Sequence, residues 1–220
     1  MKQFLRTMFV VLCCIGTLTS VPVQAADGSS ESSPVTVTAD GFAFSGGTIY
    51  GIDADWFQAQ LPAGQTEGHL YVALEIPAEV DGRDVTAISP FAFTSSWSTD
   101  KEKYHALNYH NYGHLTFTIV SADFSQASCL RSIGNQSFMN SSISGVLDLS
   151  QTPLERFEKM AFNGCDNLTG VVLPDTLQEI GPSCFLDCTG LRFVTTQDIY
   201  AAFGDALVDF TLPDGLKVID

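Results

Sequence analysis

A 23-residue pattern is written twice in succession between residues 154 and 194. The first copy reads LERFEKMAFNGCDNLTGVV and the second reads LPDTLQEIGPSCFLDCTGLRFV. At matching positions the first copy has Leu154, Phe157, Phe162, Cys165 and Leu168, and the second has Leu177, Ile180, Phe185, Cys188 and Leu191. A fixed period of this length marks a protein of stacked repeats, because one short repeat cannot bury its own apolar residues. The pattern therefore predicts a repeat solenoid.

The same apolar spacing, three residues and then five, occurs twice more upstream. These copies are Val85, Ile88 and Phe93, and Leu130, Ile133 and Phe138. Leu216 and Ile219 begin another copy that is incomplete at the end of the sequence. The longer gaps between copies predict insertions at about 94–115 and 195–210 within a solenoid of residues 77–220. We expect the four phenylalanines of the pattern, Phe93, Phe138, Phe162 and Phe185, to form one buried column.

The text of the repeat is specific enough to suggest a family. From Ile180 it reads Ile-Gly-x-x-x-Phe-x-x-Cys-x-x-Leu, preceded by Leu-Pro-Asp-x-Leu, and residues 76–93 read IPAEVDGRDVTAISPFAF. Together these stretches resemble the BspA-type leucine-rich repeat of bacterial surface proteins and its usual first repeat, over roughly residues 70–220. The resemblance implies a leucine-rich-repeat fold. It also implies a function in adhesion or in binding host or matrix molecules, with varied ligands.

Each coil is expected to contribute one short strand and one return segment. Residues 168–173 alternate apolar and other positions, which predicts a short strand in each coil and a parallel sheet when the coils stack. Gly134, Gly181 and Pro182 disfavour a long regular helix after the strand. The return segments are therefore predicted to be short helical or 3-10 turns.

The N-terminus carries the features of an export signal. Lys2 and Arg6 precede an apolar run that is too short to span a bilayer, and small residues near Ala25 suit cleavage. We expect a signal peptide at 1–25 and a serine-rich flexible leader at 26–34. No long apolar run follows, so no membrane insertion is expected after signal removal.

Residues 35–76 are predicted to form a β-rich N-terminal cap. Apolar alternation on both sides of Gly46-Gly47 predicts a hairpin within 35–52, and His69–Ile76 predicts a further strand. A cap is needed because the first coil otherwise exposes its apolar interior and its strand edge. The alternative is a small separate ligand-binding domain.

The charge of the chain restricts its partners. The formal net charge is −15, and it becomes −17 when Lys2 and Arg6 leave with the signal peptide. A surface this acidic repels phosphate backbones and anionic lipid heads, so nucleic acid and bare membrane are excluded as partners. The charge otherwise serves solubility, or a site for cations or a basic partner.

Cys165 and Cys188 occupy the same repeat position and are expected to point inward. The simplest interpretation is that each thiol is a small apolar filler. In an exported protein a Cys165–Cys188 disulfide is the alternative, since equivalent positions on adjacent coils lie about 5 Å apart. The four cysteines after residue 25 do not offer the convergent ligands of a zinc site.

The insertion at 95–114 holds the richest aromatic cluster in the chain. It contains Trp97, Tyr104, Tyr109 and Tyr112, together with His105, His110 and His114. Loops that interrupt a scaffold often carry function, and Tyr and Trp suit contact with protein or sugar. The simplest interpretation is a self-packed cover over the first coil. The alternative that concerns function is a ligand platform made of the four aromatic residues, and metal capture by the three histidines is a third.

The second insertion and the end of the chain suggest two further surfaces. Residues 195–210 are predicted to hold a short amphipathic helix, with Ile199, Phe203 and Leu207 on one face, that docks on the solenoid. The last repeat lacks a polar cap. We therefore expect an open apolar edge at Leu212, Leu216 and Ile219, covered by further chain or by self-association.

These observations favour a binding protein over an enzyme. The sequence has no GxSxG, P-loop or HExxH motif, and no cofactor or metal site is expected. The leading hypothesis is a secreted or surface-displayed protein that binds a protein or glycan on a host, matrix or neighbouring cell. A structural spacer within a longer display protein is the alternative, and a carbohydrate-processing enzyme is a third hypothesis.

Overall fold

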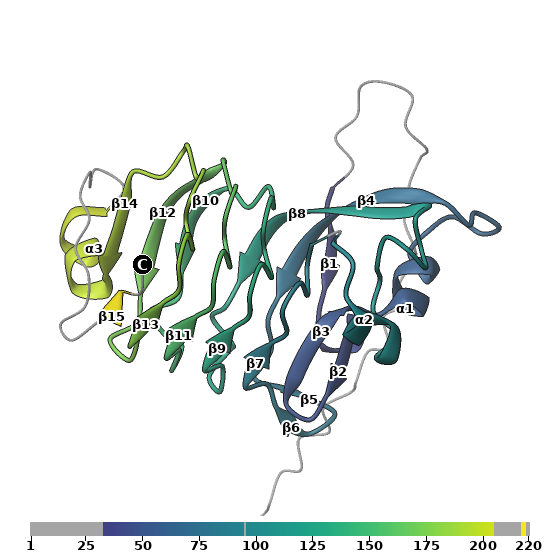
Figure 1. Ribbon diagram of the computed structural model, residues 1–220, viewed down its shortest axis with the longest axis horizontal. Coiled ribbons are helices and arrows are strands. Elements are labelled where there is room, and N and C mark those ends of the chain that lie inside the picture. Colours follow the sequence, from purple (N-terminus) through teal and green to yellow (C-terminus); the bar gives the residue numbers. More distant parts are fainter. Residues whose placement is uncertain (1–32, 95, 205–216, 219–220) are drawn as a thin grey trace, which may run out of the picture.

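The structure is a computed structural model that describes residues 33–94, 96–204 and 217–218. Short strands stand side by side along its long axis, with the N-terminal elements at one end and helix α3 at the other (Figure 1). The predicted signal peptide, most of the predicted leader, and Leu207, Leu212, Leu216 and Ile219 lie outside the described residues. Among the helices that are described, none is long and apolar enough to cross a bilayer.

Two-residue strands from successive repeats form a parallel sheet along one face. They are β7 (Ala87–Ile88), β9 (Ser132–Ile133), β11 (Arg156–Phe157), β13 (Glu179–Ile180) and β15 (Lys217–Val218). The residues aligned across the first four strands are Ile88, Ile133, Phe157 and Ile180. They are the same position in the four copies of the sequence pattern, so the repeat sets the register.

The last strand of this sheet departs from the pattern by one residue. Val218 stands opposite Ile180, whereas the spacing of the repeat predicts Ile219 at that position. The second insertion lies between these two strands in the sequence, so the number of residues in it affects which residue stands opposite Ile180. A match of spacing alone therefore does not fix register after an insertion.

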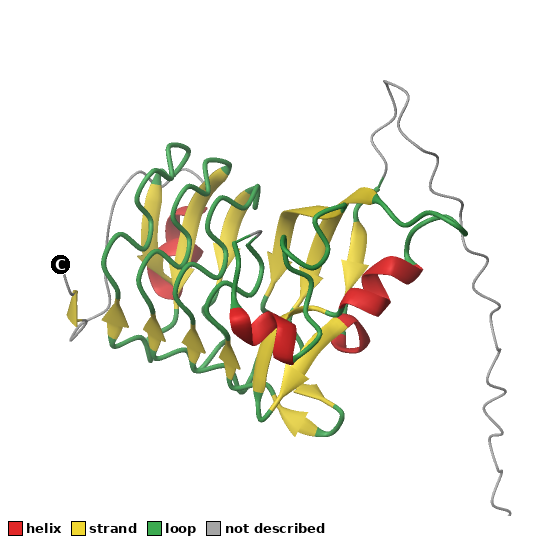
Figure 2. Ribbon diagram, turned by 45° about the vertical axis from the view of Figure 1, so that its right-hand side comes forward, coloured by secondary structure: helices red, strands yellow, loops and turns green. Residues whose placement is uncertain are grey.

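A second strand in each repeat lies on another face of the array (Figure 2). Three of these strands, β10 (Gly145–Asp148), β12 (Leu168–Leu173) and β14 (Phe193–Thr196), form one parallel sheet. Three more, β1 (Val35–Val37), β4 (Gly68–Glu75) and β8 (Leu115–Asp123), form another. Each repeat thus carries two strands rather than the one expected, because a strand of two residues is too short to leave an alternating pattern in the sequence.

The return segments are turns, so the prediction of helical or 3-10 segments was wrong for the described repeats. The residue three positions after each aligned position has a positive φ, between 54° and 61°; these residues are Phe91, Gln136, Met160 and Ser183. A left-handed residue interrupts a right-handed helix. Single i→i+3 bonds remain, such as Ser137 N–H to the Gly134 carbonyl at 3.3 Å. Other backbone groups bond between repeats, as in Gln136 N–H to the Lys159 carbonyl at 3.0 Å and Phe138 N–H to the Ala161 carbonyl at 2.8 Å.

The phenylalanines of the pattern stack in one column. The ring centroids of Phe93 and Phe138 are 5.0 Å apart, those of Phe138 and Phe162 are 5.0 Å apart, and those of Phe162 and Phe185 are 5.7 Å apart. Phe138 and Phe162 are fully buried, while Phe185 in the last described repeat is only partly buried.

Beside the column, the cysteine thiols donate to backbone carbonyl groups and form no disulfide. The Cys165 thiol donates to the Phe138 carbonyl at 3.3 Å, and the Cys188 thiol donates to the Phe162 carbonyl at 3.1 Å. Both thiols are free, and so are Cys129 and Cys184. Contact with Cys188, followed by burial, raises the pKa of the Cys165 thiol. The structure therefore does not contain the Cys165–Cys188 disulfide that was the alternative.

The N-terminal part continues the sheets of the repeats. The predicted hairpin is present, with β2 (Phe42–Ser45) antiparallel to β3 (Thr48–Ile52) and positive φ at Gly46 and Gly47 in the turn. Strand β1 is not part of it and pairs in parallel with β4. Strand β3 pairs in parallel with β7, and β4 with β8. Strands β3 and β4 therefore occupy, in the two sheets, the positions next to β7 and β8 that an additional repeat would occupy.

Short elements connect these strands. Helix α1 (Ala54–Ala59) follows β3, and the Asp53 carboxylate accepts a hydrogen bond from the Trp56 backbone at its start. The 3-10 turn η1 (Ala39–Gly41) precedes β2. Strands β5 (Glu79–Val80) and β6 (Arg83–Asp84) form a small antiparallel pair before β7. None of these elements was predicted from the apolar pattern.

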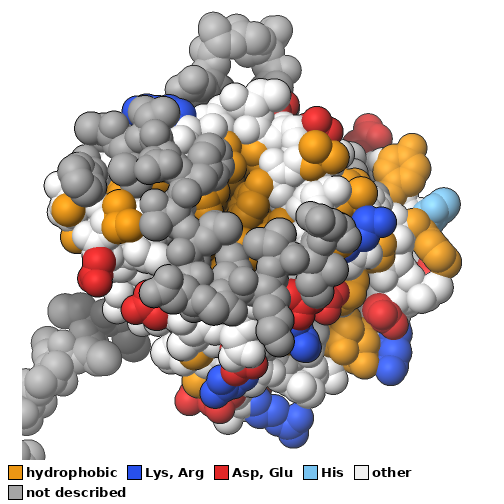
Figure 3. Space-filling view, turned by 60° about the vertical axis from the view of Figure 1, so that its left-hand side comes forward, with side chains coloured by type: hydrophobic (Ala, Val, Ile, Leu, Met, Phe, Trp, Pro, Cys, Tyr) orange, Lys and Arg blue, Asp and Glu red, His pale blue; other side chains and the backbone are white. Residues whose placement is uncertain are grey.

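Helix α3 (Gln197–Phe203) closes the described array at its other end, as expected for the second insertion. It packs on β12 and β14, and the Tyr200 ring stacks on the Phe193 ring at 5.6 Å. Phe193 in turn lies over Gly170, where an added Cβ would be 2.1 Å from the ring. Hydrophobic side chains gather at this end of the array (Figure 3). Leu191 is among the partly buried ones.

Truncating one ring of the column tests its place in the core. Phe162→Ala removes a fully buried ring that stacks on both neighbours, and we expect it to lower the free energy of unfolding by about 3–5 kcal/mol. Denaturant unfolding followed by circular dichroism gives the value. Leu186→Ala, at a side chain that is 52% exposed, is the control and should cost less than about 0.5 kcal/mol. A loss below about 1 kcal/mol for Phe162→Ala would contradict the buried column.

The contact between Gly170 and Phe193 gives a second test. Gly170→Ala should cost about 1–3 kcal/mol, because the new methyl group overlaps a ring that is itself held against Tyr200. The same change in a Phe193→Ala background should cost almost nothing, since the clashing ring is gone. Equal costs in the two backgrounds would show that Gly170 is needed for some other reason.

Candidate functional site

The aromatic insertion leaves the array between β7 and β8 and packs against the N-terminal part. It contains the short helix α2 (Thr99–Lys103), which contacts β3. Its backbone is fixed in two places: Leu107 N–H donates to the Ile52 carbonyl at 2.8 Å, and the His105 carbonyl accepts from Ala54 N–H at 3.0 Å. The insertion is therefore held by main-chain hydrogen bonds as well as by side-chain packing.

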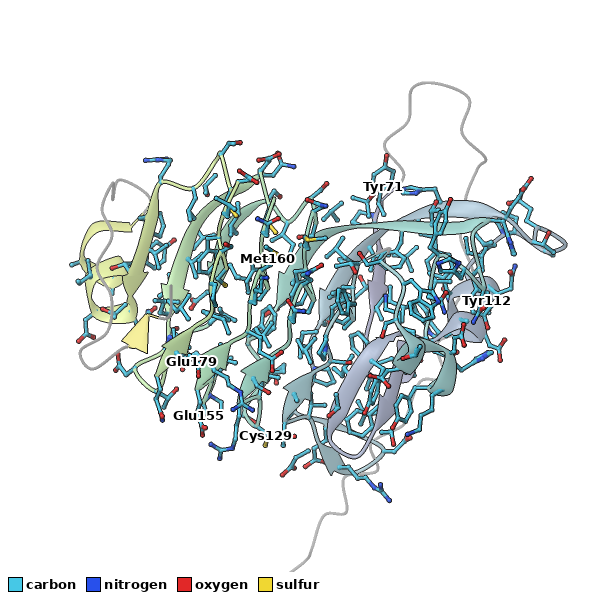
Figure 4. All side chains as sticks on the ribbon, viewed as in Figure 1. Tyr71, Tyr112, Cys129, Glu155, Met160 and Glu179 are labelled. Atoms are coloured by element: carbon cyan, nitrogen blue, oxygen red, sulfur yellow. The ribbon has the colours of Figure 1, made fainter. Side chains whose placement is uncertain are left out.

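Two of the four predicted aromatic residues anchor the insertion. The Tyr104 ring stacks on Tyr50 with centroids 3.6 Å apart, and burial followed by the bond to Tyr104 raises the pKa of Tyr50 to about 12. Tyr112 is partly buried against the core, and its hydroxyl lies 3.3 Å from His105 Nδ1, on the side of helix α1 (Figure 4). For these two residues the structure favours the alternative of a self-packed cover.

The other two aromatic residues are exposed, and both rings pack against one histidine. Trp97 is 49% exposed and Tyr109 is 61% exposed. The Trp97 ring lies 5.8 Å from His110 and the Tyr109 ring lies 6.0 Å from it, both edge to face. We call Trp97, Tyr109 and His110 the aromatic patch. The structure thus brings together two of the predicted platform residues with one histidine, and leaves Tyr104 and Tyr112 outside.

A cavity of about 200 Å³ lies beside the patch, between the insertion and strand β8; we call it the insertion cavity. Leu107, Leu115 and Phe117 form apolar walls, and Tyr109 belongs to both the cavity and the patch. No charged side chain lines it. The cavity can therefore receive a small, mostly apolar and uncharged group.

Asn108 also belongs to the lining of this cavity, together with Thr94 and Thr116. Its Oδ1 accepts from the backbone N–H groups of His110 at 2.9 Å and Asn111 at 3.1 Å. This capping fixes the amide, so Nδ2 must be the free end. Among the described residues Nδ2 is buried without a hydrogen-bond partner, and the side chain is only 2% exposed. Sequence reasoning missed Asn108, because nothing distinguishes it from the other asparagines of the insertion.

The three histidines do not converge on a metal. His105 Nε2 lies 3.1 Å from the Asp55 carboxylate, and His110 lies between the rings of the aromatic patch. Within the part of the chain that the structure describes, no group of three or more His, Cys, Asp and Glu side chains could hold a metal ion. The interpretation of His105, His110 and His114 as a metal-capture cluster is therefore not supported.

A larger cavity, of about 320 Å³, lies at the ends of β4 and β8. Its lining includes Glu75, Glu79 and Asp123. The Asp123 carboxylate already accepts the backbone N–H of Ser125 at 2.8 Å, and none of the lining side chains is a buried polar group without a partner in the described chain. The insertion cavity is therefore the stronger candidate for a ligand.

Lys101 lies at the base of the insertion, where it is 1% exposed. Its ammonium donates to the Thr94 carbonyl at 2.7 Å, and burial lowers the pKa of Lys101 to about 7. No ion pair with a carboxylate is present for Lys101 among the described residues. A buried amine of this kind makes the stability of the insertion depend on pH.

The stability of the protein should rise with pH above neutrality because of Lys101. Between about pH 7 and about pH 10.5 the unfolded chain binds a proton on Lys101 that the folded chain does not. The free energy of unfolding should therefore increase by up to about 1.4 kcal/mol per pH unit in this range. Urea unfolding measured at a series of pH values should show that Lys101→Met removes this rise in the free energy of unfolding. Lys103→Met, at an exposed lysine of the same helix, should keep it, and an unchanged slope in Lys101→Met would contradict the assignment.

Comparison with known proteins places the chain in a family. No curated protein and no solved structure matches it. The family model described as the BspA type Leucine rich repeat region matches residues 88–209 in six copies, which is more than half of the chain. The matched residues run from the aligned position of β7 through the last described repeat. The chain therefore belongs to the BspA-type leucine-rich-repeat family.

Proposed function

We propose that this chain is a secreted or surface-displayed binding protein without catalytic activity. In this proposal the repeats form a solenoid that acts as a rigid scaffold, and the insertion presents the aromatic patch to a partner. The partner is a protein or glycan on a host, matrix or neighbouring cell. Leucine-rich-repeat regions generally mediate protein interactions, so membership of the family supports a binding role.

The observation that carries the proposal is the exposure of Trp97 and Tyr109. Large aromatic side chains are normally buried, and those that remain on a surface are enriched at binding sites. Both rings belong to a segment whose main chain is bonded to Ile52 and Ala54. A partner would therefore meet rings that are already positioned, which lowers the entropy lost on binding.

The proposed location rests on the first 25 residues and on the family. The sequence of residues 1–25 has the charge, apolar run and small residues of a signal peptide. The BspA-type family, which the repeats match, is associated with bacterial surface and secreted proteins. Adhesion is the function that fits both a location outside the cell and an exposed aromatic patch.

Two other functions receive less support. A spacer needs no exposed rings, and an insertion that only covered the first repeat would pack Trp97 and Tyr109 against the protein, as it packs the partly buried Tyr104 and Tyr112. A carbohydrate-processing enzyme that uses the aromatic insertion needs an acid–base pair beside it, and the lining of the insertion cavity contains no carboxylate. The larger cavity is lined by Glu75, Glu79 and Asp123, but its lining includes no residue of the insertion. Both observations favour the binding protein.

The double variant Trp97→Ser/Tyr109→Ser tests the proposal. We expect the full chain to bind at least one member of a panel of immobilised matrix proteins and mucins. The double variant should weaken that binding by about tenfold or more, because exposed rings dominate such contacts. Its Tm should stay within about 2 °C of the original, since neither ring is part of the core.

Leu186→Ser is the matched control, because Leu186 is 52% exposed but lies in the last described repeat. It should leave binding unchanged. Loss of folding in the double variant would show that the patch is a structural cover. Equal binding by the original chain and the double variant would show that the binding surface lies elsewhere on the chain, and no binding by either would support the spacer.

A further inference from the structure

We propose that the first part of strand β8 binds an extended, basic segment of a partner protein by strand addition at Phe117. The inference rests on the proposed binding function of the insertion and specifies the partner as a peptide main chain rather than a glycan. In this arrangement the added strand lies between β8 and the insertion. Its main chain bonds to Phe117, and one of its side chains enters the insertion cavity.

The first part of β8 is paired with another strand on one side only. Strand β4 pairs with β8 along its whole length. On the other side, the next repeat first bonds at Ile119, where the Ser142 N–H donates to the Ile119 carbonyl at 2.8 Å. Figure 1 shows β4 and β8 running together beyond β10. Residues 115–118 therefore form a strand edge that no other strand of the described chain covers; we call it the β8 edge.

The backbone of Phe117 faces this open side. The Gly68 N–H of β4 donates to the His114 carbonyl at 3.0 Å, directly before β8 begins. Backbone groups of successive residues in a strand point to opposite sides, so Thr116 also faces β4 and Phe117 faces away from it. Ile119, two residues further on, bonds on the same side as Phe117.

Both backbone groups of Phe117 are available to a new strand. Among the described residues, no hydrogen bond reaches the Phe117 N–H or carbonyl from the open side. In an antiparallel pair, one residue exchanges two such bonds with the residue opposite. An extended peptide presents a carbonyl and an N–H at this spacing, which favours a protein segment over a glycan.

There is space beside the edge for an added strand. The insertion cavity and a second cavity, of about 110 Å³, both have Thr94 and Phe117 in their linings. The linings include Leu115 in the first cavity and Ile119 in the second, so the space follows β8. Because an added strand has the spacing of β8, side chains two residues apart can enter the two cavities.

The β8 edge lacks the features that usually prevent strand addition. Exposed sheet edges commonly carry lysine, proline or an inward-pointing charge. Residues 115–118 read Leu-Thr-Phe-Thr and contain none of these. The insertion stands beside the edge, but its own main chain bonds to Ile52 and Ala54. The edge and the insertion are thus fixed to one scaffold with an unfilled space between them.

Charge restricts which peptide can enter. The chain carries a formal net charge of −15, and no charged side chain lines either cavity. An acidic segment would be repelled at long range, whereas lysine or arginine at the ends of the segment would be attracted. The residues that enter the cavities must themselves be uncharged, because a buried charge would have no partner there.

Amide hydrogen exchange of the free full chain, followed by NMR, tests whether the edge is open. The Phe117 amide should exchange at least about tenfold faster than the Thr116 and Thr118 amides, which bond to β4. Equally slow exchange at Phe117 would show that the chain covers its own edge. Protection of Phe117 that rises with protein concentration would show that a second copy covers it. Either result would overturn the inference.

The binding probe is the capped peptide Lys-Val-Thr-Val-Thr-Val-Lys, added to the full chain. It should bind with a Kd on the order of 1 mM or tighter and slow the exchange of the Phe117 amide by about tenfold or more at saturation. The same peptide with glutamate at both ends should bind about tenfold more weakly at low salt. No binding by the lysine peptide would overturn the inference, and so would protection of Phe117 by mucin glycans alone.

Two changes remove the proposed main-chain bonds. Phe117→Pro deletes the N–H at a position where an edge strand accepts proline, and it should abolish peptide binding. Phe117→Leu keeps the N–H and is the matched control, which should still bind. Should Phe117→Pro fail to fold, the original chain is tested with the peptide N-methylated on all valines or on all threonines. At least one N-methylated peptide should not bind, and retained binding of both, or by a folded Phe117→Pro variant, would overturn the inference.

The remaining outcomes separate this inference from the proposed function. An edge that binds no peptide, together with loss of matrix binding in Trp97→Ser/Tyr109→Ser, would remove the inference and keep the proposed function. Peptide binding that depends on the Phe117 N–H, with unchanged matrix binding in that double variant, would keep the strand-addition site and remove the role of the aromatic patch in adhesion.

Discussion

Parallel pairing between neighbouring repeats is the constraint on which the rest of the structure depends. Once Ile133 stands opposite Ile88 and Phe157, the same repeat must place Phe138 against Phe93 and Phe162. Hydrogen bonds between return segments then follow, because the turns of adjacent repeats run side by side. The Cys165 and Cys188 thiols complete the interior by bonding to the carbonyl groups of the preceding repeats. One register thus fixes the core and the backbone ladder.

The same pairing explains how an insertion can be placed accurately. Strand β3 aligns with β7, so the N-terminal hairpin is a fixed neighbour of the first repeat. The insertion leaves after β7 and returns at β8, and it bonds to Ile52 and Ala54 immediately after β3. Tyr104 on Tyr50 closes the contact. The aromatic patch and the insertion cavity are therefore positioned by elements of the array and do not depend on the order of a free loop.

Predictions from the sequence succeeded where residues of one type recur at a fixed spacing. The positions of Ile88, Ile133, Phe157 and Ile180 do so, and their alignment could be predicted from the sequence. The two-residue strands and the turns could not, because two residues are too few to show an alternating pattern and the left-handed position, such as Gln136, holds a different residue type in each repeat. The division of the four aromatic residues into anchors and exposed rings depends on Tyr50 and His105, which only folding brings to them.

Two buried polar groups in one insertion have different physical meanings. The Lys101 side chain donates to the Thr94 carbonyl, and its burial lowers the pKa of the amine to about 7. The Asn108 amide nitrogen has no partner in the described chain, but the oxygen of the same amide accepts from the backbone N–H groups of His110 and Asn111. A leucine or methionine in the same space would leave those two N–H groups without this acceptor. Lys101 therefore makes the stability of the insertion depend on pH, whereas Asn108 fixes the course of its main chain, and the unpaired Nδ2 is the cost of that cap.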